Sequence, residues 1–179
     1  MNLEELRLDC AVKQKKGLHF IIASIVIWCA VLVIHCMDMP ILTKNLLTFC
    51  CTAPLLPIAF FISKILKVDF QNKVNPLTNL GILFSANQIL YLLIAMWVYP
   101  TVPEKMLMVI AMIFGAHLLP FGWLYKSKTY MILSVVISLA ALFVGLRFEP
   151  YVLAAIMIGI EVIFAICLFL ENRKLPRRV

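Results

Sequence analysis

Long apolar runs, separated by short polar and proline-containing connections, make up most of the chain. Each run is close to the length that an α-helix needs to cross a hydrocarbon core, about 20 residues for about 30 Å. The pattern predicts six membrane-spanning helices, over residues 18–37, 41–63, 77–98, 105–125, 129–146 and 151–170. Because the connections are short, consecutive helices should be antiparallel neighbours. We expect one domain over residues 1–179, an all-α polytopic integral membrane protein built as a bundle of six transmembrane helices.

The composition agrees with this prediction, because 64% of the 179 residues are hydrophobic and only 14% are charged. Soluble domains carry about 25% charged residues and about 45–50% apolar ones. The spans leave little sequence for a separate soluble domain. The segment NLEELRLDC before the first span is either a short amphipathic turn on the membrane surface or a solvated lead-in.

The 16 basic residues are divided unequally between the two sides of the predicted bundle. Only Lys44, Lys105 and Arg147 fall on the side opposite the termini. The other thirteen fall on the side of the termini, and they are Arg7, Lys13, Lys15, Lys16, Lys64, Lys67, Lys73, Lys126, Lys128, Arg173, Lys174, Arg177 and Arg178. The positive-inside rule then places both termini in the cytoplasm. The net charge of +7 therefore indicates topology and attraction to membrane lipids, not binding to nucleic acid.

Glu161 is the only carboxylate inside a predicted span, and it lies near the middle of the sixth. An acidic side chain at that depth costs about 3 kcal/mol to insert, so an ionisable residue inside a membrane is a functional candidate by default. We expect Glu161 to carry a proton or bind a cation. The alternative is a neutral acid that makes one interhelical hydrogen bond.

Four further polar residues occur at similar depth in other spans. They are Asn87 and Gln88 in the third span, His117 in the fourth and Ser138 in the fifth. Around Glu161 these side chains would line a polar cavity that binds a substrate or an ion. Alternatively, their hydrogen bonds only hold the helices together. His117 could also exchange protons near neutral pH.

Two spans contain internal prolines within octets of related sequence. Residues 53–60 read APLLPIAF, and residues 116–123 read AHLLPFGW. Proline removes a backbone hydrogen bond, so we expect the second span to bend at Pro54 and Pro57 and the fourth at Pro120. The related octets indicate a weak hairpin repeat, and broken helices carry the binding sites of many transporters.

The motif HCMDMP at the end of the first span places His35, Cys36, Met37 and Asp38 in succession. Sulfur and imidazole ligands suit Cu(I). Adjacent residues at a helix end point in different directions, however, so we expect no metal site. The chain carries no motif for a zinc hydrolase, a serine hydrolase or a nucleotide. No cofactor is therefore expected, and no motif favours an enzyme.

The stretches KQKKGLHF, LTKNLLTFC, NPLTNLGILFS and GAHLLPFGWLYKSKTY resemble an uncharacterised family of small multi-pass membrane proteins from Gram-positive bacteria. The resemblance covers most of the chain, up to ENRKL. It implies about six helices and a bacterial cytoplasmic membrane, and it transfers no activity to this chain.

Three functions are compatible with these features. The first is a small transporter or channel with Glu161 as the titrating residue, for which the short chain favours a homodimer. The second is an intramembrane enzyme for a lipid or isoprenoid, with His117 and Glu161 as acid and base. The third is a non-catalytic membrane partner or a stress or resistance factor. Polar residues at the midplane and kinked helices favour the first.

Overall fold

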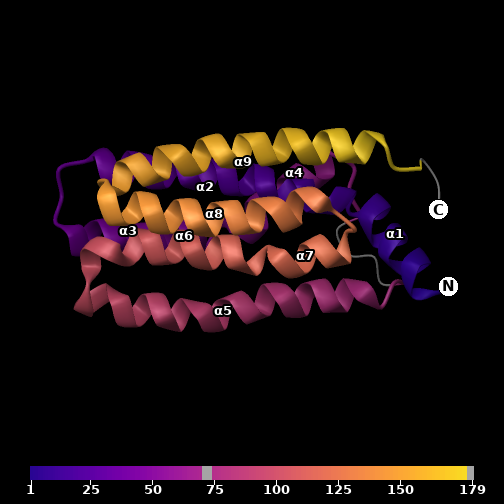
Figure 1. Ribbon diagram of the computed structural model, residues 1–179, viewed down its shortest axis with the longest axis horizontal. Helices are drawn as coiled ribbons and strands as arrows, with labels where there is room; N and C mark the ends of the chain where they lie inside the picture. Colours follow the sequence, from indigo (N-terminus) through magenta and orange to yellow (C-terminus); the bar gives the residue numbers. More distant parts are fainter. Residues whose placement is uncertain (70–73, 177–179) are drawn as a thin grey trace.

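The computed structural model describes residues 1–69 and 74–176, and these residues form helices joined by short connections (Figure 1). The elements, in chain order, are α1 (Leu3–Lys13), η1 (Lys15–Gly17), α2 (Leu18–Cys36), α3 (Ile41–Thr52), α4 (Leu55–Ile65), α5 (Leu77–Thr101), η2 (Pro103–Lys105), α6 (Met106–His117), α7 (Leu119–Leu124), α8 (Lys128–Arg147) and α9 (Pro150–Arg173). Helix α1 and the last turn of α9 lie at the same end of the bundle (Figure 1). We call this end the terminal end.

Six helical segments are long and apolar enough to cross a membrane, as the hydropathy pattern predicts. They are Lys15–Cys36, Ile41–Ile65, Leu77–Thr101, Pro103–Leu124, Lys128–Arg147 and Pro150–Arg173. Large apolar side chains such as Phe61, Leu93 and Phe143 face outward and are 66%, 60% and 64% exposed. Soluble proteins rarely expose contiguous apolar surface on this scale, so lipid covers these faces.

Both spans that carry the related octets are interrupted, at Pro54 and just before Pro120, whereas Pro57 lies within the first turn of α4. Helix α3 ends at Thr52, and α4 begins at Leu55 after Pro54. Helix α6 ends at His117, and Pro120 lies in the first turn of α7. A proline has no N–H to continue the helical hydrogen bonds, and its ring clashes with the preceding turn. The related octets at 53–60 and 116–123 thus each lie across the break of an interrupted span.

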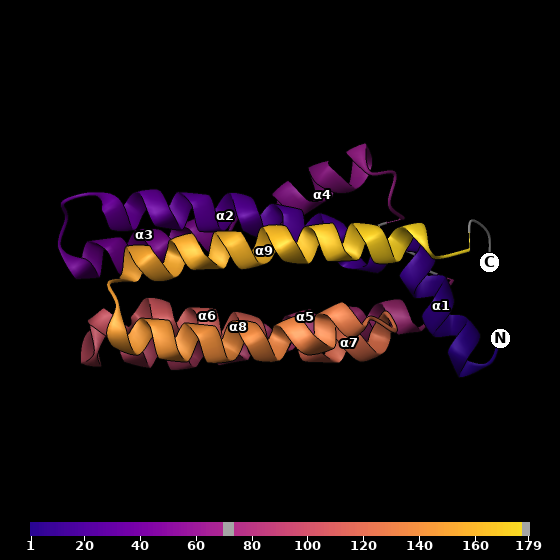
Figure 2. The same cartoon turned by 45° about the horizontal axis from the view of Figure 1, so that its top comes forward.

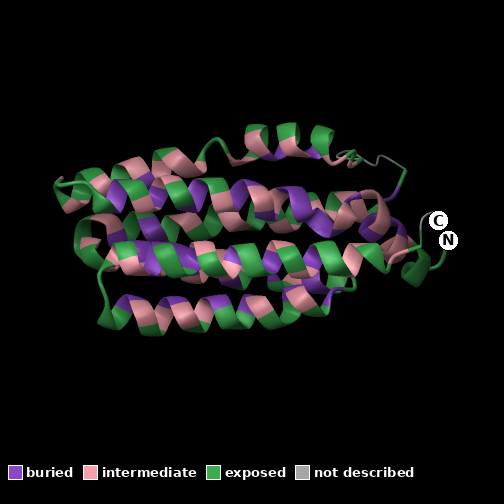
Figure 3. Cartoon of the chain, turned by 90° about the horizontal axis from the view of Figure 1, so that it is seen from above, coloured by how far each residue is buried: buried purple, intermediate pink, exposed green. Residues whose placement is uncertain are grey.

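The spans form two layers (Figure 2). Helices α2, α3, α4 and α9 make one layer, and α5, α6, α7 and α8 make the other. The closest pairs are α2 with α9 and α6 with α8, while α8 against α9 joins the layers. Buried residues gather on the central helices, and exposed residues line the outer faces (Figure 3). In the most apolar part of each span, 56% of the residues of α2 are buried but only 11% of those of α5.

Glycines allow α6 and α8 to approach closely. A Cβ added to Gly115 would lie 2.6 Å from Ser138 Oγ and 2.9 Å from the Ser138 backbone nitrogen. A Cβ added to Gly145 would lie 2.5 Å from Cγ of Met108. Small residues at such interfaces let the backbones of membrane helices come together. The α6–α8 pair therefore depends on the absence of side chains at these two positions.

Helix α1 packs on the protein itself. Its first turn carries a capping box, in which Glu5 N donates to Asn2 Oδ1 at 2.9 Å and the Glu5 carboxylate accepts from Asn2 N at 3.0 Å. Arg7 Nε donates to the carbonyl oxygen of Trp123 at 2.9 Å, and its guanidinium lies 4.5 Å from that indole ring. Asn75 Nδ2 donates to a carbonyl of α1 at 2.8 Å. The segment is thus a helix of 11 residues bound to the bundle and not a solvated lead-in, while its position at the membrane surface stays a prediction.

Candidate functional site

Glu161 lies in the interface between α9 and α2, and its side chain is fully buried. Its neighbours one turn away on α9, Met157 and Phe164, are also 0% exposed. Glu161 Oε2 lies 2.5 Å from Oγ of Ser24 on α2. Among the described residues, Glu161 Oε1 has no hydrogen-bond partner. The structure thus pairs Glu161 with a residue that the hydropathy pattern does not single out.

The hydrogen bonds of Ser24 indicate which form of Glu161 fits the site. Ser24 Oγ also lies 2.8 Å from the carbonyl oxygen of Ile21, one turn earlier on α2. A hydroxyl group has one proton to donate, and it accepts through its lone pairs. When Ser24 donates to Ile21, the short contact with Glu161 requires a proton from the carboxyl group. A neutral Glu161 that donates to Ser24 satisfies both contacts. It also avoids a buried unpaired charge, which costs far more free energy than a buried neutral carboxyl group.

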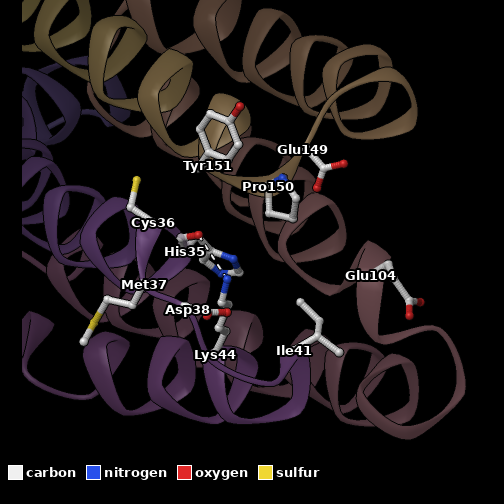
Figure 4. Close-up of a pocket in the computed structure, with 10 residues that line it drawn as sticks. All are labelled: His35, Cys36, Met37, Asp38, Ile41, Lys44, Glu104, Glu149, Pro150 and Tyr151. Carbon is white, nitrogen blue, oxygen red and sulfur yellow. Dashed lines mark hydrogen bonds between the residues drawn. The ribbon is translucent and has the colours of Figure 1, made fainter.

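An open pocket of about 690 Å³ lies at the end of the bundle opposite the terminal end, where α2 ends and α9 begins. Figure 4 shows the residues that line it. Small-molecule sites typically have volumes of about 300–1,000 Å³. Residues from α2, α3, η2 and the start of α9 line it, and they are His35, Cys36, Met37, Asp38, Ile41, Lys44, Glu104, Glu149, Pro150 and Tyr151. The motif HCMDMP therefore contributes one wall of this pocket.

The pocket is acidic. Three of its lining residues are the carboxylates Asp38, Glu104 and Glu149, and no ion pair within 4.0 Å involves them among the described residues. The lining lysine, Lys44, donates to the carbonyl oxygen of His35 at 3.2 Å (Figure 4). A concave surface with an excess of one charge concentrates ligands of the opposite sign. The pocket therefore favours a cation.

The geometry of HCMDMP does not indicate a metal centre. Within the part of the chain that the structure describes, no three or more His, Cys, Asp or Glu side chains are placed to hold a metal ion. The His35 ring is directed to α3 instead, with Nε2 at 3.2 Å from Thr48 Oγ1. Because Thr48 donates its proton to the carbonyl of Lys44 at 2.9 Å, the imidazole Nε2 must be the donor to Thr48.

An apolar layer separates the pocket from Glu161. Ser24 and His35 are eleven residues apart on α2, as are Pro150 and Glu161 on α9. At 1.5 Å per residue, each separation corresponds to about 16 Å. The buried side chains between them include Trp28, Val31, Leu153, Ala154 and Met157, each of which is at most 4% exposed. The carboxyl group is therefore closed off from the pocket in this structure.

His117 lies at the end of α6, among aromatic residues. Its Nδ1 lies 2.7 Å from the carbonyl oxygen three residues earlier, so this nitrogen carries a proton and donates it. The ring centroid of Phe121 is 5.9 Å from that of His117, Tyr130 lies 6.3 Å from Phe121, and Phe164 lies 4.7 Å from Tyr130. Aromatic rings thus fill the path from His117 to α9. No hydrogen bond or ion pair between described residues joins His117 to Glu161.

The other predicted site residues occupy separate interfaces. Asn87 is exposed on α5, and its Nδ2 donates to Oη of Tyr91 at 2.8 Å. Gln88 is half-buried at the next position of α5. Ser138 lies in the α6–α8 interface, and its hydroxyl donates to the carbonyl of Ser134 at 2.9 Å. These polar residues, which the sequence places at similar depth in the membrane, therefore do not form one polar layer with Glu161.

A second acidic residue of α9, Glu171, joins three segments at the terminal end. Its Oε2 accepts from Lys16 Nζ and from Ser127 Oγ, both at 2.7 Å. Its Oε1 accepts from the hydroxyl of Thr129 at 2.6 Å and from the backbone nitrogen of that residue at 3.2 Å. The Lys16 side chain is only 7% exposed. The positive-inside pattern accounts for Lys16 only as a topology signal, and Glu171 is not among the predicted site residues.

The backbone before α2 has an uncommon conformation that this network holds. Lys15, Lys16 and Gly17 have φ values of 46°, 50° and 69°, so three successive residues are left-handed. For a residue with a Cβ this conformation costs about 1–2 kcal/mol. Asn172 Nδ2 donates to the carbonyl of Lys15 at 2.9 Å, and a Cβ on Gly17 would lie 2.9 Å from Oη of Tyr130. The sequence signal for this junction is the pair of lysines directly before the first span, Lys15 and Lys16, together with Glu171 at the end of the last span.

These features define a six-span helical membrane protein with a buried carboxyl group at its centre and an acidic pocket at one end. The chain belongs to the family of unknown function DUF7010, which matches residues 3–171, from the start of α1 to the last turns of α9. The predicted membership of an uncharacterised family is thereby confirmed. Neither the curated proteins nor the solved structures contain a match to this chain.

Proposed function

We propose that the protein is a small proton-linked transporter in which Glu161 carries the proton. The observation that supports this function is the buried Glu161 Oε1, which lacks a hydrogen-bond partner among the described residues. An unsatisfied buried polar atom costs about 1–3 kcal/mol, so a purely structural carboxyl group would be expected to use both oxygens. If Glu161 gains and loses a proton during a transport cycle, its hydrogen bonds differ between the states of the cycle. Its Oε1 can then lack a partner in one of these states.

The acidic pocket supports a small organic cation or protonated amine as the transported partner. Its unpaired carboxylates attract positive charge, and the ring of Tyr151 offers a face for a cation–π contact. The apolar layer between the pocket and Glu161 acts as a closed gate in this proposal. Opening requires α2 and α9 to separate, as in alternating access, where one group of helices moves against another around a central site. The proposed site excludes His117, Asn87, Gln88 and Ser138, since they lie in other interfaces.

The charge distribution supports an orientation with both termini in the cytoplasm of a bacterial cell. At the terminal end lie ten described basic residues, Arg7, Lys13, Lys15, Lys16, Lys64, Lys67, Lys126, Lys128, Arg173 and Lys174. At the opposite end lie Lys44, Lys105 and Arg147. Lys73, Arg177 and Arg178 lie outside the described residues. The positive-inside rule then makes the terminal end cytoplasmic, and the pocket opens to the exterior.

Proton flux into vesicles tests this function. The purified chain is reconstituted into vesicles that contain a pH-sensitive dye, and an inside-negative potential drives protons inward. Wild-type protein should acidify the lumen, and tetramethylammonium added on the pocket side should change the rate. Glu161→Gln should fold normally, because an amide matches a protonated carboxyl group in size and hydrogen bonding, but it should lose the flux. Ser138→Ala is the matched control, since Ser138 lies at similar depth and its hydroxyl contacts the carbonyl oxygens of Ser134 on α8 and Met112 on α6, away from Glu161.

Flux in Glu161→Gln equal to that of the wild type would exclude Glu161 as the proton carrier. If empty vesicles and wild-type vesicles acidify equally under every cation tested, the transport proposal fails. The non-catalytic membrane partner would then be the better explanation, with Glu161 as an interhelical hydrogen-bonding residue. The intramembrane enzyme requires a second catalytic group beside Glu161, and His117 does not supply it in this structure.

A further inference from the structure

Helix α5 carries a row of residues with coiled-coil spacing on a face that the rest of the chain leaves uncovered. Leu83, Asn87, Leu90, Ile94 and Trp97 follow one another at alternating steps of four and three residues. The four apolar members are 62%, 63%, 50% and 66% exposed, and Asn87 is exposed as well. Alternating steps of four and three keep such residues on one side of a helix, where a partner helix can pack against them.

Asn87 distinguishes this row from an ordinary lipid-facing surface. It lies ten residues after Leu77 and fourteen before Thr101, and so near the middle of the span. The hydrogen bond from its Nδ2 to Tyr91 Oη uses one of its two amide protons. No hydrogen bond between described residues uses the second proton or the lone pairs of Oδ1, and the residue is exposed. Hydrocarbon offers no hydrogen bonds, so a polar group at this depth needs a protein partner.

We propose that a second copy of this chain covers the face, in a homodimer whose two α5 helices pack in parallel. A side-chain amide both donates and accepts, so two Asn87 side chains can satisfy each other. Two copies with the same orientation in a membrane are related by a twofold axis along the membrane normal. Such an axis brings equal residues to equal depth, and Asn87 meets Asn87 of the second copy. A single asparagine in an otherwise apolar seam also fixes the register and number of helices.

A polar residue on another face of α5 needs no partner from a second copy, and it supplies a matched control. Ser85 is also exposed, but it precedes Asn87 by two positions and therefore points about 160° away at 3.6 residues per turn. Its hydroxyl donates to the carbonyl oxygen of Gly81 at 3.1 Å. Replacing Ser85 changes the lipid-facing surface of the same helix without touching the proposed seam.

The number of subunits per particle, measured in lipid vesicles, tests the proposal. Full-length protein with a fluorophore on an added N-terminal tag is diluted into increasing amounts of lipid, and bleaching steps are counted at each dilution. We expect dimers for the wild type, a dissociation constant at least fivefold higher for Asn87→Leu, and a change of less than twofold for Ser85→Leu. In the second arm, Asn87→Cys should form a disulfide-linked dimer under mild oxidation, whereas Ser85→Cys should not.

A wild type that is monomeric at every dilution would overturn the proposal, and so would equal dissociation constants for the wild type and Asn87→Leu. An equal rise in the dissociation constant of the dimer for Asn87→Leu and Ser85→Leu would also overturn it, because the row that contains Asn87 would then contribute no more to the dimer than the face that carries Ser85. Melting temperature in detergent shows whether each variant is folded. If Asn87→Leu does not fold, the cross-linking arm decides, and failure to form the 87–87 disulfide refutes the parallel pair.

Discussion

Ser24 in the first span and Glu161 in the last span meet across the α2–α9 interface, with 2.5 Å between Ser24 Oγ and Glu161 Oε2. The two residues are 137 positions apart in the sequence. Their contact joins the most enclosed helix of the bundle to the helix that carries the single buried carboxyl group of the spans. It thereby connects the stability of the fold to the protonation of Glu161.

The Ser24–Glu161 contact should appear as a coupling energy in a double-mutant cycle. Ser24→Ala and Glu161→Leu should each destabilise the protein, with a coupling of about 0.6–2 kcal/mol, the range measured for interhelical hydrogen bonds in membranes. Unfolding in mixed detergent at neutral pH measures these differences. Ser138→Ala is the control, and its effect should add to that of Glu161→Leu. A coupling of zero between positions 24 and 161 would show that the contact contributes nothing.

Gly115→Ala should destabilise the α6–α8 pair by about 1–3 kcal/mol, the usual cost of overpacking. The new methyl group would lie 2.9 Å from the backbone nitrogen of Ser138, so the helices must move apart. Gly159→Ala on α9 is the matched control, because nothing lies within 4 Å of its added Cβ. There the loss of backbone freedom in the unfolded chain should stabilise the protein by about 0.4–1 kcal/mol. Equal melting temperatures for the two variants would contradict the close approach at Gly115.

Glu171→Gln should weaken the junction at the terminal end. It removes the negative charge that accepts from Lys16, and hydrogen bonds to charged groups contribute about 1.5–3 kcal/mol. The control is Glu4→Gln, which removes the ion pairs with Arg7 and Lys126, but from a side chain that is 58% exposed. Exposed ion pairs contribute little, so Glu4→Gln should leave the melting temperature unchanged. Limited proteolysis of the segment before α2 should accelerate only in Glu171→Gln, and equal rates would argue against the junction.

Cys36 and Cys10 should differ sharply in labelling. Cys36 is exposed in the pocket, so a membrane-impermeant maleimide should modify it from outside sealed cells. Cys10 in α1 is 0% exposed, and burial raises the pKa of its thiol. A higher pKa leaves less of the reactive thiolate at neutral pH, so Cys10 should resist labelling even in opened membranes until the pH rises. Labelling that persists in Cys36→Ser, or that requires opened cells, would contradict the proposed orientation.

The spans and their breaks were predictable because each depends on short-range features. A run of apolar residues sets the length of a membrane helix, and a proline in the interior of a span removes a helical hydrogen bond. The interruptions at Pro54 and Pro120 follow from this local effect, whereas Pro57 in the first turn of α4 and Pro100 in the last turn of α5 are accommodated within helices. The same reasoning left two alternatives open for α1, because its docking uses contacts with Trp123 and Asn75 far along the chain.

The partners of the buried residues were not predictable in this way. Depth along a span can be counted from the sequence, and it groups Glu161 with Ser138 and Asn87. Rotation about the helix axis and the choice of neighbouring helix depend on packing, and these place Ser24 rather than Asn87 beside Glu161. The Lys16–Glu171 pair was not predicted for the same reason, since the two residues meet only when the first and last spans are adjacent.

The adjacency of α2 and α9 also dictates an order of assembly during synthesis. Ribosomes add about 5–20 residues per second, so Ser24 waits about 7–27 s for Glu161 to be made. Throughout that interval the most enclosed helix of the finished bundle lies in the bilayer without its main partner, and lipid or the insertion machinery must shield the surface that α9 later covers. A nascent chain that stalls before residue 150 would keep that surface open, and would be recognisable to membrane proteases as unfinished.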